Sequence, residues 1–110
     1  MKTSSILENL EFNDSKPAIK LLLESDFSKE IRISFKEGQI MQEHQTPYPI
    51  VVQVFKGEIK FGVNNQIVLL KEGDLITLEG GVPHDLTAVK ESIVRLTLSK
   101  SDSLQRVKNI

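Results

Sequence analysis

GQIMQEHQTPYPIVVQVFKG, residues 38–57, is the stretch of this sequence that decides the fold. It begins and ends with glycine, and its histidine, His44, follows Gly38 after five residues. Side chains two apart on a strand share a face, so His44 and Thr46 are expected to point the same way. Glycine permits sharp bends, so Gly38 and Gly57 are expected to mark the places where flanking strands turn. The stretch therefore predicts strands separated by bends, with one imidazole at a fixed place on one face.

A second stretch, GDLITLEGGVPH at residues 73–84, ends on His84, the other of the two histidines in the chain. Fifteen residues lie between Gly57 and Gly73, just enough for a strand, a turn and a second strand. Asn64-Asn65 suits that turn because asparagine tolerates positive φ. The two histidine segments can therefore close onto one another.

Periodicity predicts short strands through most of the chain. Ile31, Ile33 and Phe35 alternate with polar residues, which is typical of a half-buried strand. The other expected strands are Ile50–Phe55, Glu58–Val63, Leu75–Leu78, Asp85–Val89 and Ser92–Leu98. Short strands at spacings of about 8 to 12 residues are typical of an antiparallel sandwich or barrel. Helix is expected only as a turn or two at Ser5–Leu10 and Ser101–Val107, so the fold class is all-β.

Composition indicates one domain and excludes several functions. A chain of 110 residues with 39% apolar content can close one core. Its 14 basic and 15 acidic residues nearly balance, which argues against nucleic acid as a partner. Cysteine is absent, which removes thiolate catalysis and disulfides. The apolar runs are far shorter than the roughly 20 residues a membrane span needs, so we expect no membrane partner and a cytoplasmic protein.

The paired glycine and histidine spacing resembles the signature of the cupin superfamily, G-x5-H-x-H-x(3,4)-E-x6-G followed by G-x5-P-x-G-x2-H-x3-N. The resemblance covers residues 30–98 and implies a double-stranded β-helix, a jelly-roll barrel. It also implies an interior metal held by three histidines and one glutamate. His44 and His84 match the first and last histidine, whereas Thr46 stands at the second histidine and Ile50 at the glutamate.

Those two replacements weaken the expected metal site. Catalytic metals normally have three protein ligands and an exchangeable water. The nearest acid, Glu43, neighbours His44 on the strand and so is expected to face the other way, unless a bulge reverses the parity. In the second pattern Glu79 and Ala88 replace the family's proline and asparagine.

The resemblance and the apolar segment Ala18–Leu23 together predict the organisation of the chain. Residues 1–29 are expected to add strands and dimer contacts, residues 30–98 to form the barrel core, and residues 99–110 to be a tail. Because a barrel of this size leaves sheet edges to cover, we expect a homodimer.

Two classes of function remain open, and whether the protein is an enzyme is left undecided. The first is a module that binds a small organic molecule in the barrel, with no cofactor. The second is a metal-dependent dioxygenase, isomerase or lyase acting on a small organic acid or phenol, in which His44 and His84 hold zinc, nickel, iron or manganese. The expected pocket residues are His44, Thr46, Ile50, Val52, Val54 and His84, with Tyr48 at the rim.

Overall fold

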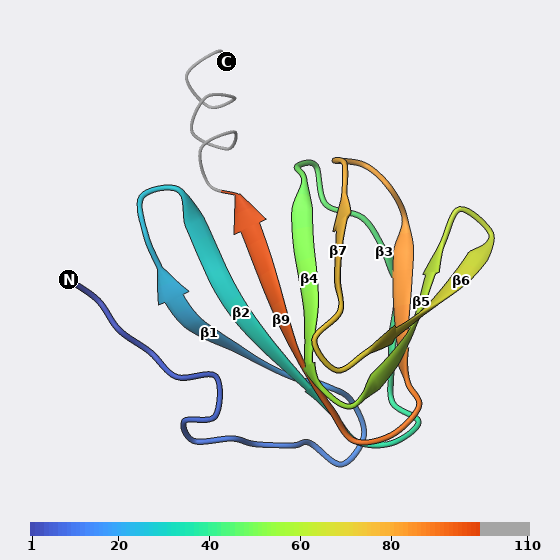
Figure 1. Ribbon diagram of the computed structural model, residues 1–110, viewed down its shortest axis with the longest axis horizontal. Coiled ribbons are helices and arrows are strands. Elements are labelled where there is room, and N and C mark those ends of the chain that lie inside the picture. Colours follow the sequence, from blue (N-terminus) through green and yellow to red (C-terminus); the bar gives the residue numbers. More distant parts are fainter. Residues whose placement is uncertain (100–110) are drawn as a thin grey trace.

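The computed structural model describes residues 1–99, which form β-strands joined by turns and loops (Figure 1). The strands are β1 (Ala18–Glu24), β2 (Ser28–Phe35), β3 (Ile40–His44), β4 (Ile50–Lys56), β5 (Glu58–Val63), β6 (Gln66–Lys71), β7 (Leu75–Leu78), β8 (His84–Ala88) and β9 (Ser92–Ser99). The predicted strands are confirmed, with ends shifted by a few residues. The expected helical turns at Ser101–Val107 lie outside the described residues.

The strands form two antiparallel sheets, which together make the predicted double-stranded β-helix. Sheet A has the order β1-β2-β9-β4-β7, and sheet B has the order β3-β8-β5-β6. Strands far apart in the sequence are neighbours in both sheets, as in β2 beside β9 and β3 beside β8. In Figure 1, β1 lies at one side of the molecule and the β5–β6 hairpin at the other. The all-β jelly roll predicted from the sequence is confirmed.

Glycines of the two sequence patterns bend the chain where the spacing predicts. Gly38, Gly57, Gly73 and Gly81 all have φ between +80° and +96°, the left-handed region in which residues with a Cβ are strained. Asn64-Asn65 joins β5 to β6 with φ values of 52° and 61°, which fits the predicted tight hairpin.

The hydrophobic core lies between the sheets and follows the strand alternation. Its buried members are Ile33, Phe35, Ile50, Val52, Val54, Ile59, Phe61, Leu70, Leu86, Ala88 and Val94. Sheet A and sheet B both contribute, so burial of these side chains holds the two layers together.

The N-terminal segment forms a hydrogen-bonded turn where the sequence predicts helix. In residues 5–10 the Glu8 amide donates to the Ser5 carbonyl oxygen, but no helix follows. The buried Arg32 guanidinium, 2% exposed, donates to the carbonyl oxygens of Ile6, Glu8 and Asn9. A helix cannot continue through Asn9, whose φ of 49° is left-handed, and the Arg32 contacts hold the carbonyl oxygens of this turn instead.

No helix in residues 1–99 is long and apolar enough to cross a membrane.

Candidate functional site

The two histidines lie directly opposite one another on neighbouring strands of sheet B. His44 ends β3, His84 begins β8, and the two are partners in the antiparallel register. Their ring centroids are 4.4 Å apart, and the ring planes are inclined by 58°. Residues that are 40 positions apart in the sequence thus form one pair of imidazoles.

A β-bulge sets the direction of His44. In the register of β3 and β8, Met41 pairs with Leu86 and His44 pairs with His84, so β3 holds one more residue than β8 between the two pairs. On a regular strand, side chains three residues apart, as Met41 and His44 are, would face opposite sides of the sheet. The bulge places both on the core side, where Met41 packs against the core and His44 contacts His84.

The same hydrogen-bond pattern fixes both imidazole rings. Nδ1 of His44 lies 2.8 Å from the carbonyl oxygen of Gln42, and Nδ1 of His84 lies 2.9 Å from the carbonyl oxygen of Val82. A carbonyl oxygen can only accept, so Nδ1 carries the proton in each ring. In the neutral form each Nε2 therefore has a free lone pair, and neither Nε2 has a hydrogen-bond partner within residues 1–99.

His84 is the more buried of the two histidines. It is 3% exposed, and the Phe61 ring stacks on it with centroids 5.5 Å apart and planes 9° from parallel. Burial lowers the pKa of His84 from its ordinary value, and the nearby His44 lowers it further. Two effects oppose this shift and raise the pKa: the hydrogen bond that His84 donates to the Val82 carbonyl oxygen, and the negative charge of Asp85. His44 is half-buried, so the pair is reached from solvent on its side.

Two loops close over the strands that carry the histidines. The Gly81 amide, in the loop before β8, donates to the carbonyl oxygen of Thr46, in the loop after β3. A side chain at Gly80 would collide with the carbonyl of Pro47, so the loops approach closely there. Tyr48, the predicted rim residue, is half-buried in this loop with a buried hydroxyl.

The predicted pocket residues separate into two groups. His44 and His84 meet, while Thr46 lies in the adjoining loop, where its hydroxyl donates to the carbonyl oxygen of Tyr48 at 2.9 Å. The remaining three side chains on β4 are packed in the core: Ile50, Val52 and Val54. Their assignment to a ligand pocket stays a prediction.

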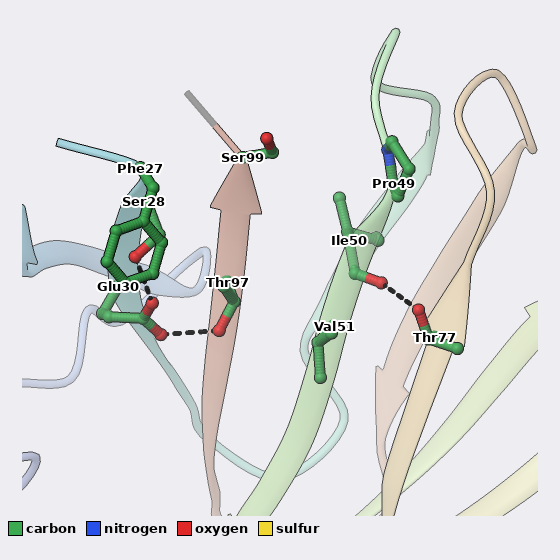
Figure 2. Close-up of a pocket in the computed structure, with 9 residues that line it drawn as sticks. All are labelled: Phe27, Ser28, Glu30, Pro49, Ile50, Val51, Thr77, Thr97 and Ser99. Atoms are coloured by element: carbon green, nitrogen blue, oxygen red, sulfur yellow. Dashed lines mark hydrogen bonds between the residues drawn. The ribbon is translucent and has the colours of Figure 1, made fainter. Parts of the chain in front are cut away.

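Neither of two cavities found in residues 1–99 is lined by a histidine. One, of about 300 Å³, lies at the ends of β2, β9 and β4, where Phe27, Glu30 and Ile50 are among its lining residues (Figure 2). The other, of about 280 Å³, is lined by Glu43 and Asp85 near the β5–β6 hairpin. Asp85 is adjacent to His84 on a regular part of β8 and so faces the opposite side of sheet B, and Glu43 lines the same cavity as Asp85.

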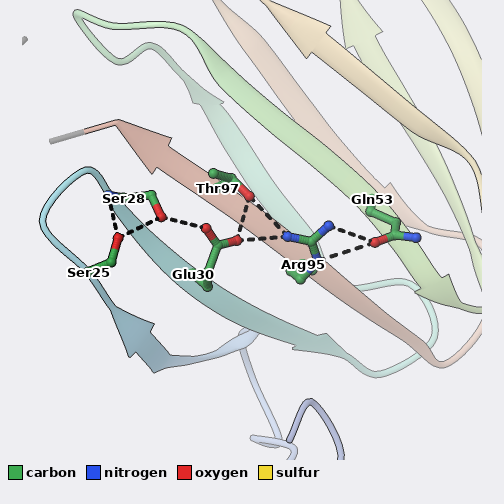
Figure 3. A network of polar contacts seen from close by, with 6 residues as sticks. All are labelled: Ser25, Ser28, Glu30, Gln53, Arg95 and Thr97. Carbon is green, nitrogen blue, oxygen red and sulfur yellow. Dashed lines mark hydrogen bonds and ion pairs between the residues drawn. The ribbon is translucent and has the colours of Figure 1, made fainter. Parts of the chain in front are cut away.

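A polar network on the outer side of sheet A was missed by sequence reasoning (Figure 3). Arg95 donates to Glu30 and to Gln53, and Glu30 also accepts from Ser28. Gln53 and Arg95 alternate with core residues on their strands, and this alternation is the signal in the sequence. Recognising the network requires the strand order β2-β9-β4, which the alternation does not supply.

The residues present do not fit a tightly held transition metal. Within residues 1–99 no group of three or more His, Cys, Asp or Glu is placed to hold one. The Thr46 hydroxyl is engaged with the Tyr48 carbonyl, and Ile50 supplies no donor atom. Two imidazoles alone fall short of the three protein ligands of a catalytic zinc site.

Comparison with known proteins agrees with this architecture. The family model described as the cupin domain matches residues 31–99. The chain belongs to the cupin family. Its barrel is similar to an RmlC-like cupin from Desulfovibrio desulfuricans, with 25% identity, a TM-score of 0.82 and coverage of 90% of this chain and 96% of that one. No curated protein matches the chain significantly.

Two further solved structures share the fold of this cupin at lower identity. An RmlC-like cupin from Shewanella frigidimarina is 23% identical, with a TM-score of 0.76 and coverage of 90% of this chain and 91% of that one. KdgF from a Halomonas species is 15% identical, with a TM-score of 0.76 and coverage of 94% and 99%. At these identities the likeness is one of fold alone.

Proposed function

We propose that this cupin binds a small organic molecule at the His44–His84 pair. The observation that carries the proposal is the pair itself: two contacting imidazoles, each with an Nε2 that lacks a partner within residues 1–99. Phe61 stacks on one side, and Met41 packs nearby against the core. Ligand sites typically place a few polar groups beside apolar side chains, and the histidine pair has this chemistry.

The loop that contains Tyr48 supports an entrance on the His44 side. His44 is half-buried and His84 is buried, so a ligand would meet His44 first. Prolines on both sides stiffen the Tyr48 loop, and the hydrogen bond from Gly81 to Thr46 ties it to the neighbouring loop. We therefore propose Tyr48 as a rim residue of the binding site.

Thermal-shift screening of small acids, phenols and sugars tests the proposal. A ligand that binds only the native state, at a concentration a hundred times its Kd, raises the free energy of unfolding by about 2.7 kcal/mol, and Tm rises measurably. We expect the rise to be lost in His84→Phe, which removes the Nε2 acceptor and keeps a ring beside Phe61. The control is Gln45→Ala, because the Gln45 side chain is exposed next to the site. Ligand stabilisation that survives in both His44→Phe and His84→Phe contradicts the proposal.

A metal-dependent cupin enzyme, a dioxygenase, isomerase or lyase, is the alternative. It is favoured by the hydrogen bonds at Nδ1, because histidines that bind metals commonly donate their other N–H to a carbonyl or carboxylate. The missing ligands argue against it, and we expect the purified protein to carry clearly less than one transition metal per chain. Stoichiometric zinc, nickel, iron or manganese that survives chelator dialysis and disappears in His44→Ala would establish the alternative.

The double variant Thr46→His with Ile50→Glu sharpens the metal test. It restores the two ligand types that the cupin pattern contains at these positions. We expect it to be less stable than the natural protein without metal, because a carboxylate would replace the buried apolar side chain of Ile50, and to regain stability when zinc or nickel is added. If the folded variant binds neither metal, the side chains at positions 44, 46, 50 and 84 do not point at one site.

We also propose that two copies of the chain associate through β1. Ile19 and Leu21 pair with Ile33 and Ile31 of β2, so they lie on the core side of sheet A, yet they are 63% and 49% exposed. A second subunit would cover this apolar edge strand. Light scattering at tens of micromolar is expected to give twice the mass of one chain, and Leu21→Lys is expected to lower it. A monomer at that concentration contradicts the proposal.

A further inference from the structure

The two histidines have the same protonation pattern, and this restricts what they can bind. Both Nδ1 atoms face backbone carbonyl oxygens, those of Gln42 and Val82. Because a carbonyl oxygen cannot donate, each Nδ1 must keep its proton, and each neutral ring presents only a lone pair at Nε2. With both rings neutral, the site is therefore a pair of hydrogen-bond acceptors, with no donor at either Nε2.

We propose that the ligand is a neutral molecule with an apolar body and two adjacent hydroxyl groups, which donate to Nε2 of His44 and His84. This inference rests on the proposed function, because it concerns the ligand class of the same site. The two acceptors are the reason for proposing two hydroxyl groups on the ligand, because each O–H would donate to one Nε2. A neutral imidazole pair offers a carboxylate no donor, so a carboxylate could bind only by also drawing a proton onto one Nε2, which costs free energy above the pKa of the ring.

The distance between the rings explains why the two hydroxyl groups are adjacent. The ring centroids are 4.4 Å apart, so two donors that lie close together on one small molecule suit both imidazoles. Hydroxyl groups on neighbouring carbons of a ring or chain satisfy this requirement. A compound with a single hydroxyl would leave one Nε2 unpaired.

The surroundings of His84 explain the apolar body and the absence of charge. Phe61 stacks on the His84 ring, and Val63 is the register partner of His84 on β5 and packs against the core. An ammonium group could also donate to both Nε2 atoms. The neighbouring acids Glu43 and Asp85 border the cavity on the other side of the sheet, so neither carboxylate would form a direct ion pair with such a cation.

The protonation pattern is tested directly, without a ligand. Long-range nitrogen–proton NMR correlations of nitrogen-labelled protein distinguish a protonated ring nitrogen from one with a lone pair. At about pH 8, where an ordinary imidazole is neutral, we expect Nδ1 protonated and Nε2 unprotonated for both histidines. With two histidines in the chain, the spectrum of His84→Gln assigns the signals. A proton on Nε2 of either residue overturns the inference.

The ligand class is tested with three cyclohexane compounds at the same pH. They are the cis diol with hydroxyls on adjacent carbons, its dimethyl ether, and cyclohexanecarboxylate. By calorimetry we expect binding of the diol alone, because the ether lacks donors and the carboxylate lacks a partner. His84→Phe is expected to weaken diol binding at least about tenfold, the equivalent of one lost hydrogen bond. His84→Gln keeps an acceptor and is expected to restore part of the affinity.

The outcomes separate this inference from the proposed function. If cyclohexanecarboxylate binds in a His84-dependent way and the diol does not, the ligand class is wrong and the site stands. If none of the three binds while the thermal-shift screen finds another His84-dependent ligand, the ligand class is again wrong. If the diol binds equally to the natural protein, His44→Phe and His84→Phe, both the ligand class and the site are wrong.

Discussion

The packed interior around β4 and β5 and the histidine end of β3 and β8 are built by the same strand alternation in different ways. In the interior, Val54, Ile59 and Phe61 are fully buried, and each points inward as a strand period of two predicts. At the histidine end a bulge resets that period, and the inward side chains are imidazoles whose remaining lone pairs lack partners within residues 1–99. Packing thus accounts for the interior, whereas the histidine end requires an added residue and two polar groups that packing does not explain.

Phe61 joins the two regions, and its removal is expected to have the largest effect on stability. It is fully buried in the core and stacks on His84. Phe61→Ala deletes a buried ring and leaves a cavity, so we expect the free energy of unfolding to fall by about 3–5 kcal/mol in denaturant titrations. Phe61→Leu is the milder control, because it keeps most of the apolar volume and loses only the stacked ring. A cost below about 1 kcal/mol for Phe61→Ala would mean that the interior is less tightly packed than the burial indicates.

Two glycines with positive φ, one in each region, allow the backbones of the two regions to be compared. Gly57, between β4 and β5, has φ +96°, and a Cβ there would collide with Ser92 and the Glu91 carbonyl. Gly81, in the loop before His84, has φ +80° with open space around it. Both alanine variants pay for the left-handed backbone, about 1–2 kcal/mol, and only Gly57→Ala adds a steric clash.

We therefore expect Gly57→Ala to lower Tm clearly more than Gly81→Ala. The comparison of the two variants cancels the common backbone cost and isolates the close approach of β5 to Ser92. Equal shifts in Tm would show that the loop between β4 and β5 relaxes to accept a methyl group.

The sequence predicts the interior well because alternation and turn chemistry are local. Ile31, Ile33 and Phe35 alternate with polar residues, and the glycines of the two patterns and Asn64-Asn65 all adopt the expected positive φ. The jelly-roll order follows from the resemblance to cupins, which supplies the long-range pairings that alternation lacks.

The histidine end is predicted less completely, for physical reasons that can be named. The spacing brings His44 and His84 together, but the bulge between Met41 and His44 depends on the register with β8, which no local pattern encodes. The protonation pattern depends on carbonyls two residues before each histidine, in loops and strand ends whose backbone direction is not set by residue type. The helical turns expected at Ser5–Leu10 are wrong because Asn9 has a left-handed φ of 49°, in a turn whose carbonyl oxygens are held by Arg32, far away in the sequence.

Thr46 stands where the cupin pattern has a metal-binding histidine, and substitutions of it show whether the residue has a structural role in this protein. Its hydroxyl donates to the Tyr48 carbonyl oxygen at 2.9 Å, which holds the loop over the histidines. Thr46→Val keeps the shape and removes the donor, so we expect a loss of about 1 kcal/mol in the free energy of unfolding. Thr46→Ser keeps the donor and is expected to stay close to the natural stability. Loss of stability in Thr46→Ser equal to that in Thr46→Val would assign the effect to the methyl group instead of the hydrogen bond.

The smallest expected effect is a dependence of stability on pH that comes from His84. Burial lowers the pKa of His84 from its ordinary value of 6.5, whereas in the unfolded chain the group keeps that value. As the pH falls below 6.5 the unfolded state therefore takes up a proton before the folded state does, and the free energy of unfolding falls. The decline ends at the lower pKa of the folded protein, below which both states are protonated. We expect unfolding titrations between about pH 7 and pH 5.5 to show this slope in the natural protein and in Gln45→Ala, and a shallower slope in His84→Phe. An unchanged slope in His84→Phe would mean that the buried end of the histidine pair titrates as it does in the unfolded chain, and the contrast between interior and histidine end would then rest on the bulge alone.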